Sequence, residues 1–288
     1  MEFGKWSDYW GAKEMIEIPN NGQFNVYTSI GNHKFCVLCV HGAGHSALSF
    51  SLLAKDIQRF CNVIAYDLKC HGETPGNESD DLSIENLTRD CVDIYHHYQK
   101  PDVKMILLGH SLGGCIASKA AATLRPTGLF VLDTIEGIAM SMMPKMTRIL
   151  SSRPQQFSSP KEVISYISTS GEMMNSKSAE ISALGRVIEK NGKYVWRTNL
   201  FPSERHWNDW FKGFADIFLK APTYKVIILP SIDRLDKPFT IGHMSGKFQL
   251  EIVQHSNHCI HEDHPQDIST IIERFIERMS EIPQWNFK

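Results

Sequence analysis

The sequence contains no apolar run near the roughly 20 residues that a membrane-spanning helix requires. Its first residues, MEFGKWSDYWGAKEM, show neither the apolar core of a secretion signal nor an Arg- and Ser-rich transit composition. It also lacks an excess of positive charge, since 30 Lys and Arg stand against 32 Asp and Glu, with a net charge of -2. We therefore expect a cytoplasmic or nuclear protein that binds neither a membrane nor nucleic acid.

Cysteine is sparse and scattered: the seven positions form no disulfide framework and no metal-binding motif. Cys36 and Cys39 lie three apart in a predicted strand, so their side chains point to opposite faces of the sheet. We expect seven reduced thiols that act as small apolar filling.

Apolar, β-rich runs alternate with helical stretches along most of the chain, as in a mostly parallel sheet covered on both faces. The eight predicted strands are residues 15–19, 23–29, 35–40, 62–67, 104–109, 129–133, 225–230 and 248–253. A helix is predicted after an N-cap at Ser83, and another over the 3,4-spaced apolar residues from Ile268 to Met279. Residues 1–288 are therefore expected to form a single α/β domain with an eight-stranded sheet.

About ninety residues between Asp133 and Lys225 show no strand alternation, which predicts a helical cap inserted between strands six and seven at about residues 137–220. The apolar side chains of this insertion have two interpretations: they seat the cap on the main domain, or some of them line a substrate groove. The candidates for the groove are Met140, Met143, Trp196 and Phe211.

The stretch LLGHSLGGCIA matches G-x-S-x-G, with Ser111 between Gly109 and Gly113. In this motif the serine occupies a sharp turn from a strand to a helix, where a Cβ at either glycine would clash. The predicted strand at 104–109 and a helix rich in small residues after Ser111 provide that context. Ser111 is therefore the candidate nucleophile.

A nucleophilic serine needs a histidine as general base and an acid to orient that histidine. The segment HSNHCIHED follows the last predicted strand, and we predict His258 as the base, with His261 beside Glu262 as the competitor.

The acid has two candidate places. In the commonest arrangement it follows the seventh strand, where the sequence has Asp233 and Asp236. After the sixth strand the sequence has Asp133, with Glu136 near it. Spacing alone does not decide between them.

Two backbone N–H groups should form the oxyanion hole, one from Leu112 and one from the loop after the third strand. That loop reads HGAGHSALSF and predicts the Ala43 N–H as the second donor, while its neighbours Gly42, Gly44 and His45 are candidate substrate contacts. Nucleotide-binding motifs of the G-x-G-x-x-G and G-x-x-x-x-G-K-[ST] types are missing.

Eight blocks between residues 35 and 265 together resemble the protein phosphatase methylesterase family of α/β-hydrolases: HGAGHSALSF, DLKCHGET, GHSLGG, VLDTIEGIAM, RHWNDWFKGF, IDRLDK, IGHMSGKFQ and HCIHED. The resemblance implies the acid in VLDTIEG, Asp133, together with Ser111 and His258, and leaves Asp233 and Asp236 a structural role. Two departures are Ala43, where the family usually has glycine, and a charged cap insertion reduced to residues 189–194.

The resemblance further implies demethylation of the C-terminal leucine of the catalytic subunit of type 2A protein phosphatases, through an acyl-enzyme and without metal or cofactor. That subunit would be the partner. Two alternatives remain open: a small-molecule carboxylesterase or acyl hydrolase with the same catalytic residues, or a non-catalytic module that binds and inhibits the phosphatase.

Overall fold

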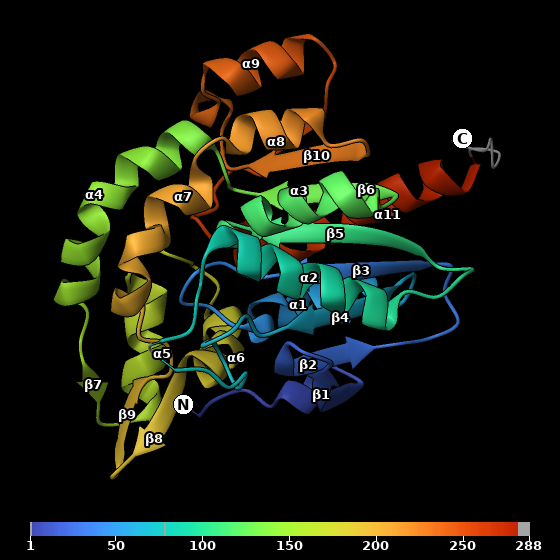
Figure 1. The fold of residues 1–288 in the computed structure, drawn as a ribbon. Helices are drawn as coiled ribbons and strands as arrows, with labels where there is room; N and C mark the ends of the chain where they lie inside the picture. Colours follow the sequence, from blue (N-terminus) through green and yellow to red (C-terminus); the bar gives the residue numbers. More distant parts are fainter. Residues whose placement is uncertain (1, 78, 282–288) are drawn as a thin grey trace.

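The computed structural model describes residues 2–77 and 79–281, and an eight-stranded sheet forms its centre (Figure 1). The sheet order is β1-β2-β4-β3-β5-β6-β10-β11. Only the pairs β1/β2 and β2/β4 are antiparallel. All eight predicted strands are present, which confirms the α/β-hydrolase fold class. Their bounds are β1 (Ala12–Ile18), β2 (Gly22–Ser29), β3 (Phe35–Val40), β4 (Asn62–Tyr66), β5 (Lys104–His110), β6 (Gly128–Leu132), β10 (Tyr224–Leu229) and β11 (Gln249–Ile252).

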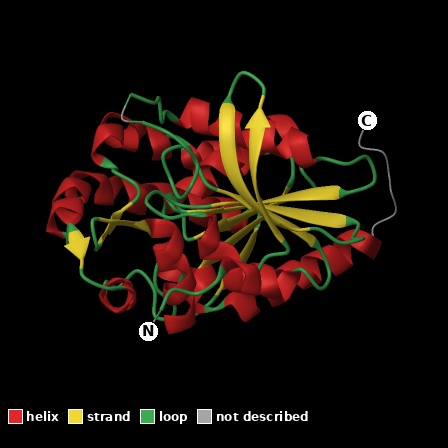
Figure 2. Ribbon diagram, turned by 90° about the horizontal axis from the view of Figure 1, so that it is seen from below, coloured by secondary structure: helices red, strands yellow, loops and turns green. Residues whose placement is uncertain are grey.

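Helices cover both faces of the twisted sheet, as the view in Figure 2 shows. One face packs against α2 (Ile84–Tyr98) and α3 (Leu112–Leu124), and the other against α1 (Ser51–Ile57) and α11 (Pro265–Glu281). Strand β3 divides its side chains between the two cores: Cys36 lies on the first face and Cys39 on the second, as predicted. A sheet buried on both faces explains why its strands read as continuous apolar runs.

The two best-defined predicted helices form as expected. The Ser83 side chain caps α2 by accepting a hydrogen bond from the Asn86 N–H at 3.4 Å. Helix α11 buries the apolar stripe from Ile268 to Met279 against the sheet. None of the helices in the described part of the chain has the length and apolar content needed to cross a bilayer.

The cap, residues 136–220, contains strands as well as helices. Its helices are α4 (Glu136–Ser152), α5 (Pro160–Thr169), α6 (Ser176–Arg186), α7 (Trp207–Phe211) and α8 (Phe214–Lys220). Its second sheet has the order β7 (Gln156–Phe157), β9 (Lys193–Trp196), β8 (Val187–Lys190). The expectation of a cap without strands was therefore wrong. Asn191 and Gly192, with φ of 53° and 72°, form a tight hairpin between β8 and β9, because both residue types tolerate positive φ.

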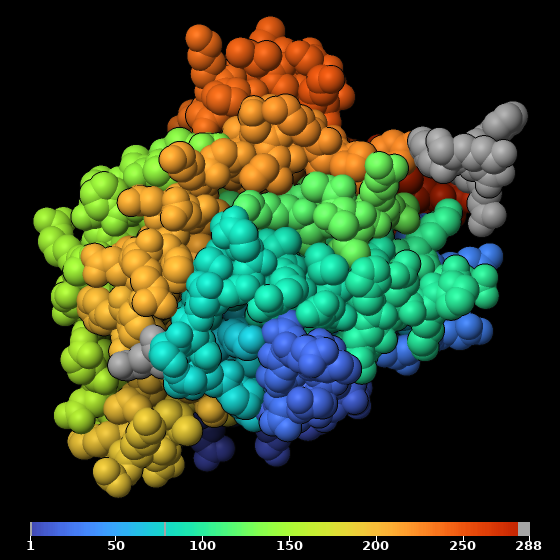
Figure 3. Space-filling view, viewed as in Figure 1, coloured from blue at the N-terminus to red at the C-terminus, as the bar shows by residue number. Residues whose placement is uncertain are grey.

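The aromatic residues Trp207, Trp210, Phe211 and Phe214 are buried in the same core as α3. They belong to two helices, since Gly213 with φ of 76° separates α7 from α8. The Trp210 indole N–H donates to the Leu82 carbonyl oxygen at 2.7 Å and so joins the cap to the loop before α2. In Figure 3 the cyan segment around that loop lies against the orange cap segment. The aromatic stripe therefore seats the cap on the main domain.

Six further helical segments complete the described chain. The 3-10 helices are η1 (Trp6–Asp8), η2 (Ala47–Phe50), η3 (Phe201–His206) and η4 (Ile232–Arg234). The α-helices are α9 (Lys237–Met244), which packs on α8, and the short α10 (Ile260–Asp263) before α11.

Replacing Gly113 with Ala tests the packing of α3 against β3. A Cβ at this position would lie 2.0 Å from the Val40 carbonyl oxygen, which the sheet holds in place. We expect the free energy of unfolding to fall by about 3 kcal/mol or more, measured by urea denaturation.

Gly11→Ala is the matched control, because the nearest atom to its Cβ would be at an ordinary contact distance of 3.4 Å. Equal stability of the Gly113→Ala variant and the unsubstituted protein would contradict this account of the close approach.

Candidate active site

Four loops that carry candidate site residues follow the carboxyl ends of strands β3, β5, β6 and β11. They contain the oxyanion loop (residues 41–46), Ser111, Asp133 and His258. These strands run parallel in one sheet, so their carboxyl ends lie along the same edge. In open α/β sheets this is the edge where ligands bind.

Ser111 has φ of 52° and ψ of -121°, a conformation that side chains other than glycine rarely adopt. A Cβ at Gly109 would lie 2.1 Å from the Gly113 carbonyl oxygen. A Cβ at Gly42 would lie 3.0 Å from the Ser111 Cβ, so the oxyanion loop passes directly beside the serine. The glycines around Ser111 are thus required by the close approach of three backbone segments.

The two predicted oxyanion donors lie on either side of this turn. Leu112 is the first residue of α3, where the partial positive charge of the helix N-terminus adds to the N–H dipole. Ala43 lies in the oxyanion loop and is half-buried. Among the described residues, neither amide N–H donates a hydrogen bond. Both donors are therefore available to an oxygen that gains negative charge.

His258 and Asp133 form a close pair: the imidazole Nδ1 lies 2.8 Å from the carboxylate Oδ2. The Asp133 side chain is 1% exposed, whereas the His258 side chain is 41% exposed. A carboxylate only accepts hydrogen bonds, so Nδ1 carries the proton and Nε2 presents its lone pair. This arrangement orients the imidazole as a proton acceptor.

His261, the competing base, is fully buried and stacks on Phe50 with ring centroids 4.6 Å apart. Burial lowers the pKa of its imidazole to about 3. Neither ring nitrogen has a hydrogen-bond partner among the described residues. His261 thus packs inside the molecule, and its imidazole is unsuited to accept a proton at neutral pH.

The other candidate acids lie in different surroundings. Asp233 is exposed. Asp236 caps α9 by accepting from the Phe239 N–H at 3.2 Å and also accepts from the Gly137 N–H at 2.9 Å, which confirms its structural role. Glu136 accepts from two backbone amides at the start of α8.

The four groove candidates in the cap differ in position. Met140 and Met143 are half-buried on α4 and pack on the main core, while Phe211 is buried in it. Trp196 lines a cavity of about 350 Å³ together with Leu200. A Cβ at Gly44 would lie 3.2 Å from a methyl group of Leu200, so this side chain lies against the oxyanion loop.

Sequence reasoning missed two contacts that fix the base and the acid. The His110 Nε2 lies 3.0 Å from the His258 carbonyl oxygen and, because that oxygen only accepts, must donate to it. The Arg234 Nε lies 3.0 Å from the second carboxylate oxygen of Asp133. The position of His110 directly before the nucleophile was a sequence signal for a role in the site. Nothing in the position of Arg234 along the sequence indicated such a role.

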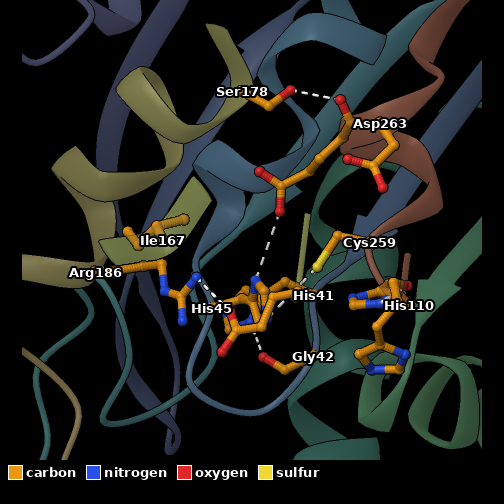
Figure 4. A network of polar contacts seen from close by, with 12 residues as sticks. His41, Gly42, His45, His110, Ile167, Ser178, Arg186, Cys259 and Asp263 are labelled. Atoms are coloured by element: carbon orange, nitrogen blue, oxygen red, sulfur yellow. Dashed lines mark hydrogen bonds and ion pairs between the residues drawn. The ribbon is translucent and has the colours of Figure 1, made fainter. Parts of the chain in front are cut away.

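His45, Cys259 and Glu262 form a buried polar cluster that joins the oxyanion loop to the His258 loop. The His45 Nδ1 lies 3.7 Å from Glu262 Oε1, and its Nε2 lies 4.0 Å from the Cys259 sulfur, which points toward it in Figure 4. One potential metal ligand from each residue lies within 4.8 Å of the others. Such a set could hold a soft divalent cation if the thiol and the carboxyl lost their protons.

Burial favours the uncharged form of each member of this cluster. It raises the pKa of the Glu262 carboxyl to about 8 and raises that of the Cys259 thiol, while it lowers the pKa of the His45 imidazole. At neutral pH the cluster is therefore organised as a neutral polar contact between two loops of the site.

The fold, the strained serine and the imidazole–carboxylate pair define the class: a serine hydrolase of the α/β-hydrolase fold. A model of the Alpha/beta hydrolase family matches residues 37–270. The structure of E-2-(acetamidomethylene)succinate hydrolase superposes with a TM-score of 0.78 at 16% identity, covering 92% of this chain and 99% of that one. An esterase of M. tuberculosis gives a TM-score of 0.73 at 17% identity, with 93% and 92% covered.

Relatives that are similar in sequence define a narrower family within this class of hydrolases. The protein phosphatase methylesterase 1 of Schizosaccharomyces pombe is 38% identical over 290 residues, which cover 95% of this chain and 84% of the relative. The human protein of the same name is 32% identical over 325 residues, with the same coverage. The chain belongs to the protein phosphatase methylesterase family, which confirms the resemblance stated from the motifs.

Glu262→Gln tests the neutral state of the buried cluster. Because the folded-state pKa of Glu262 is raised from 4.5 to about 8, the folded protein holds a proton that the unfolded chain releases, and stability is lost as pH rises through this window. This group alone contributes a slope of about -1.4 kcal/mol per pH unit. The glutamine variant lacks this titrating carboxyl. Its free energy of unfolding, measured by urea titrations from pH 5 to 8, should therefore depend less on pH.

Glu277→Gln on the exposed face of α11 is the control and should retain the slope of the unsubstituted protein. If the free energy of unfolding changes with pH at the same slope in the Glu262→Gln variant and the unsubstituted protein, Glu262 is ionised in the folded state.

Proposed function

We propose that this protein hydrolyses the methyl ester on the C-terminal leucine of the catalytic subunit of a type 2A protein phosphatase. The observation that carries the proposal is the 2.8 Å pairing of His258 Nδ1 with Asp133, at the sheet edge that also carries the Ser111 turn. The names of the relatives, at up to 38% identity in the comparisons above, support a phosphatase as the substrate.

In the first half of the reaction His258 Nε2 takes the proton from the Ser111 Oγ as that oxygen attacks the ester carbonyl carbon. The Ala43 and Leu112 N–H groups bind the oxygen that becomes negative. The bond to the methoxy group then breaks, and His258 returns its proton to the departing oxygen. Methanol leaves, and the leucine carbonyl remains esterified to Ser111.

In the second half a water molecule takes the place of the serine. His258 removes a proton from the water as its oxygen attacks the acyl-enzyme, and the same two N–H groups bind the oxyanion. The Ser111 oxygen leaves and takes the proton from His258. The products are the free leucine carboxylate and the resting enzyme, and the route uses neither a metal nor a cofactor.

Because the proposed substrate is a protein tail, we expect the cap to help bind it. The proposed groove lies between the oxyanion loop, with Gly42, Gly44 and His45, and the cap side chains Met140, Met143, Trp196 and Phe211. Trp196 lines the cavity of about 350 Å³, whose wall combines the apolar side chains of Leu150, Val195, Trp196, Leu200 and Phe201 with the polar residues Arg153, Gln155, Thr198 and Asn199. Such a mixed wall offers an apolar surface to a leucine side chain and polar groups to the peptide backbone of a tail.

Ser111→Ala removes the nucleophile but keeps the Cβ that fits the turn. We expect methanol release from a methylated phosphatase to fall by at least about 10³-fold, while binding of the phosphatase persists. Gas chromatography of the methanol and a titration of phosphatase binding provide the two readouts.

Ser280→Ala, in the last turn of α11, is the control and should release methanol at the normal rate. Methanol released by the Ser111→Ala variant at that rate would falsify the assignment of the nucleophile. Normal binding with no turnover by the unsubstituted protein would instead favour a non-catalytic inhibitory module.

The small-molecule esterase alternative makes a different prediction for the cap. We expect Met143→Ser to lower kcat/KM for the methylated phosphatase by about 10-fold, because a half-buried apolar contact is lost, and to leave kcat/KM for p-nitrophenyl acetate unchanged. If the Met143→Ser variant and the unsubstituted protein have the same kcat/KM for each of the two substrates, the small-molecule alternative is favoured.

A further inference from the structure

We propose that Arg234 is a positioning residue of this site: its guanidinium holds the Asp133 carboxylate against His258, and the carboxylate in turn keeps the imidazole oriented as a proton acceptor. The inference rests on the proposed triad but not on the identity of the substrate.

The surroundings of the Asp133 carboxylate show why it needs Arg234. One oxygen accepts from His258, and the Arg234 Nε lies 3.0 Å from the other. Among the described residues, no hydrogen bond reaches this second oxygen, and the side chain is 1% exposed. A buried carboxylate without a charge partner on one side would be costly, so the guanidinium supplies the compensation that water cannot.

Arg234 comes from the loop where the commonest α/β-hydrolase arrangement places the acid. This loop follows β10, the neighbour of β6 in the sheet, and forms the short helix η4. Here the acid has its place after β6, and the loop after β10 supplies its counter-charge instead.

The loop that carries Arg234 is itself fixed to the chain that follows Asp133. Asp236, two residues after Arg234, caps α9 through the Phe239 N–H and also accepts from the Gly137 N–H at 2.9 Å. Gly137 lies four residues after Asp133, in the first turn of α4. The backbone segments that carry the carboxylate and the guanidinium are therefore tied to each other.

Three further histidines and one ion pair surround His258. His110 lies against His258 with ring centroids 4.7 Å apart and ring planes tilted by 51°. Burial lowers the pKa of His110, His45 and His261 well below neutrality. Glu172 forms an ion pair of 2.8 Å with Arg186. Among the described residues, the ion-pair partner of Arg234 is Asp133.

The test compares Arg234→Gln with Arg234→Lys, using p-nitrophenyl acetate so that no phosphatase is needed. For the glutamine variant we expect kcat to fall about 10- to 100-fold with little change in KM, because the carboxylate and imidazole lose their alignment. The lysine variant keeps a positive charge at this position, so it should recover most of the lost kcat.

Lys237→Gln is the matched control, since it removes a positive charge from the exposed start of α9 in the same loop. It should leave kcat unchanged. A wild-type kcat for Arg234→Gln overturns the inference. So does an equal loss of kcat in the glutamine and lysine variants, which would indicate a purely structural residue.

A double-mutant cycle separates this inference from the proposed function. In an Asp133→Asn background, Arg234→Gln should have no further effect, because its action passes through the carboxylate. A full additional loss there overturns the inference. If Asp133→Asn alone has wild-type kinetics, both the triad and the role of Arg234 are overturned. If Asp133→Asn is inactive while Arg234→Gln has wild-type kinetics, only the role of Arg234 is overturned.

Discussion

The backbone of Ser111 is the constraint on which the rest of the site depends. Its positive φ costs about 1–3 kcal/mol and persists only where the surrounding structure enforces it. Three hydrogen bonds do so: the Ser111 N–H donates to Leu132, and the Ser111 carbonyl oxygen accepts from Gly114 and from the Thr134 hydroxyl. The strand, the helix and the following strand thus hold the serine side chain clear of the packed interior.

The remaining parts of the site reach this turn through contacts between loops. His110 donates to the backbone of the His258 loop, and the His45–Cys259–Glu262 cluster joins that loop to the oxyanion loop. The Asp133 N–H donates to the Ile228 carbonyl oxygen at 2.9 Å, which fixes the acid loop to β10. Because these contacts are buried or partly buried, a shift of one loop would leave polar groups unpaired in another. The sheet edge therefore behaves as one unit.

Local sequence patterns predicted the main sheet, because its strands are buried on both faces and read as apolar runs. The strands of the cap were harder to predict, because the short strands β8 and β9 carry mixed polar residues. The Asn191–Gly192 hairpin signal lies inside the segment 189–194, which the family resemblance marks as a reduced charged insertion. The glycine pattern around Ser111 was predictable because backbone clashes restrict residue type. Spacing could not choose between Asp133 and Asp233, since that choice depends on which strand ends face His258, and Arg234 becomes visible only once β6 and β10 are neighbours.

Burial distinguishes one histidine of this site from its neighbours. Burial lowers the pKa of His41 to about 4 and those of His71 and His261 to about 3, because a charged imidazole cannot be solvated in the interior. His258 differs in two respects: 41% of its side chain is exposed, and it contacts a carboxylate. A positive charge can therefore develop on His258 while the surrounding imidazoles stay neutral and do not repel it. The base is selected by where the fold leaves water and places an anion, rather than by the histidine-rich sequence around it.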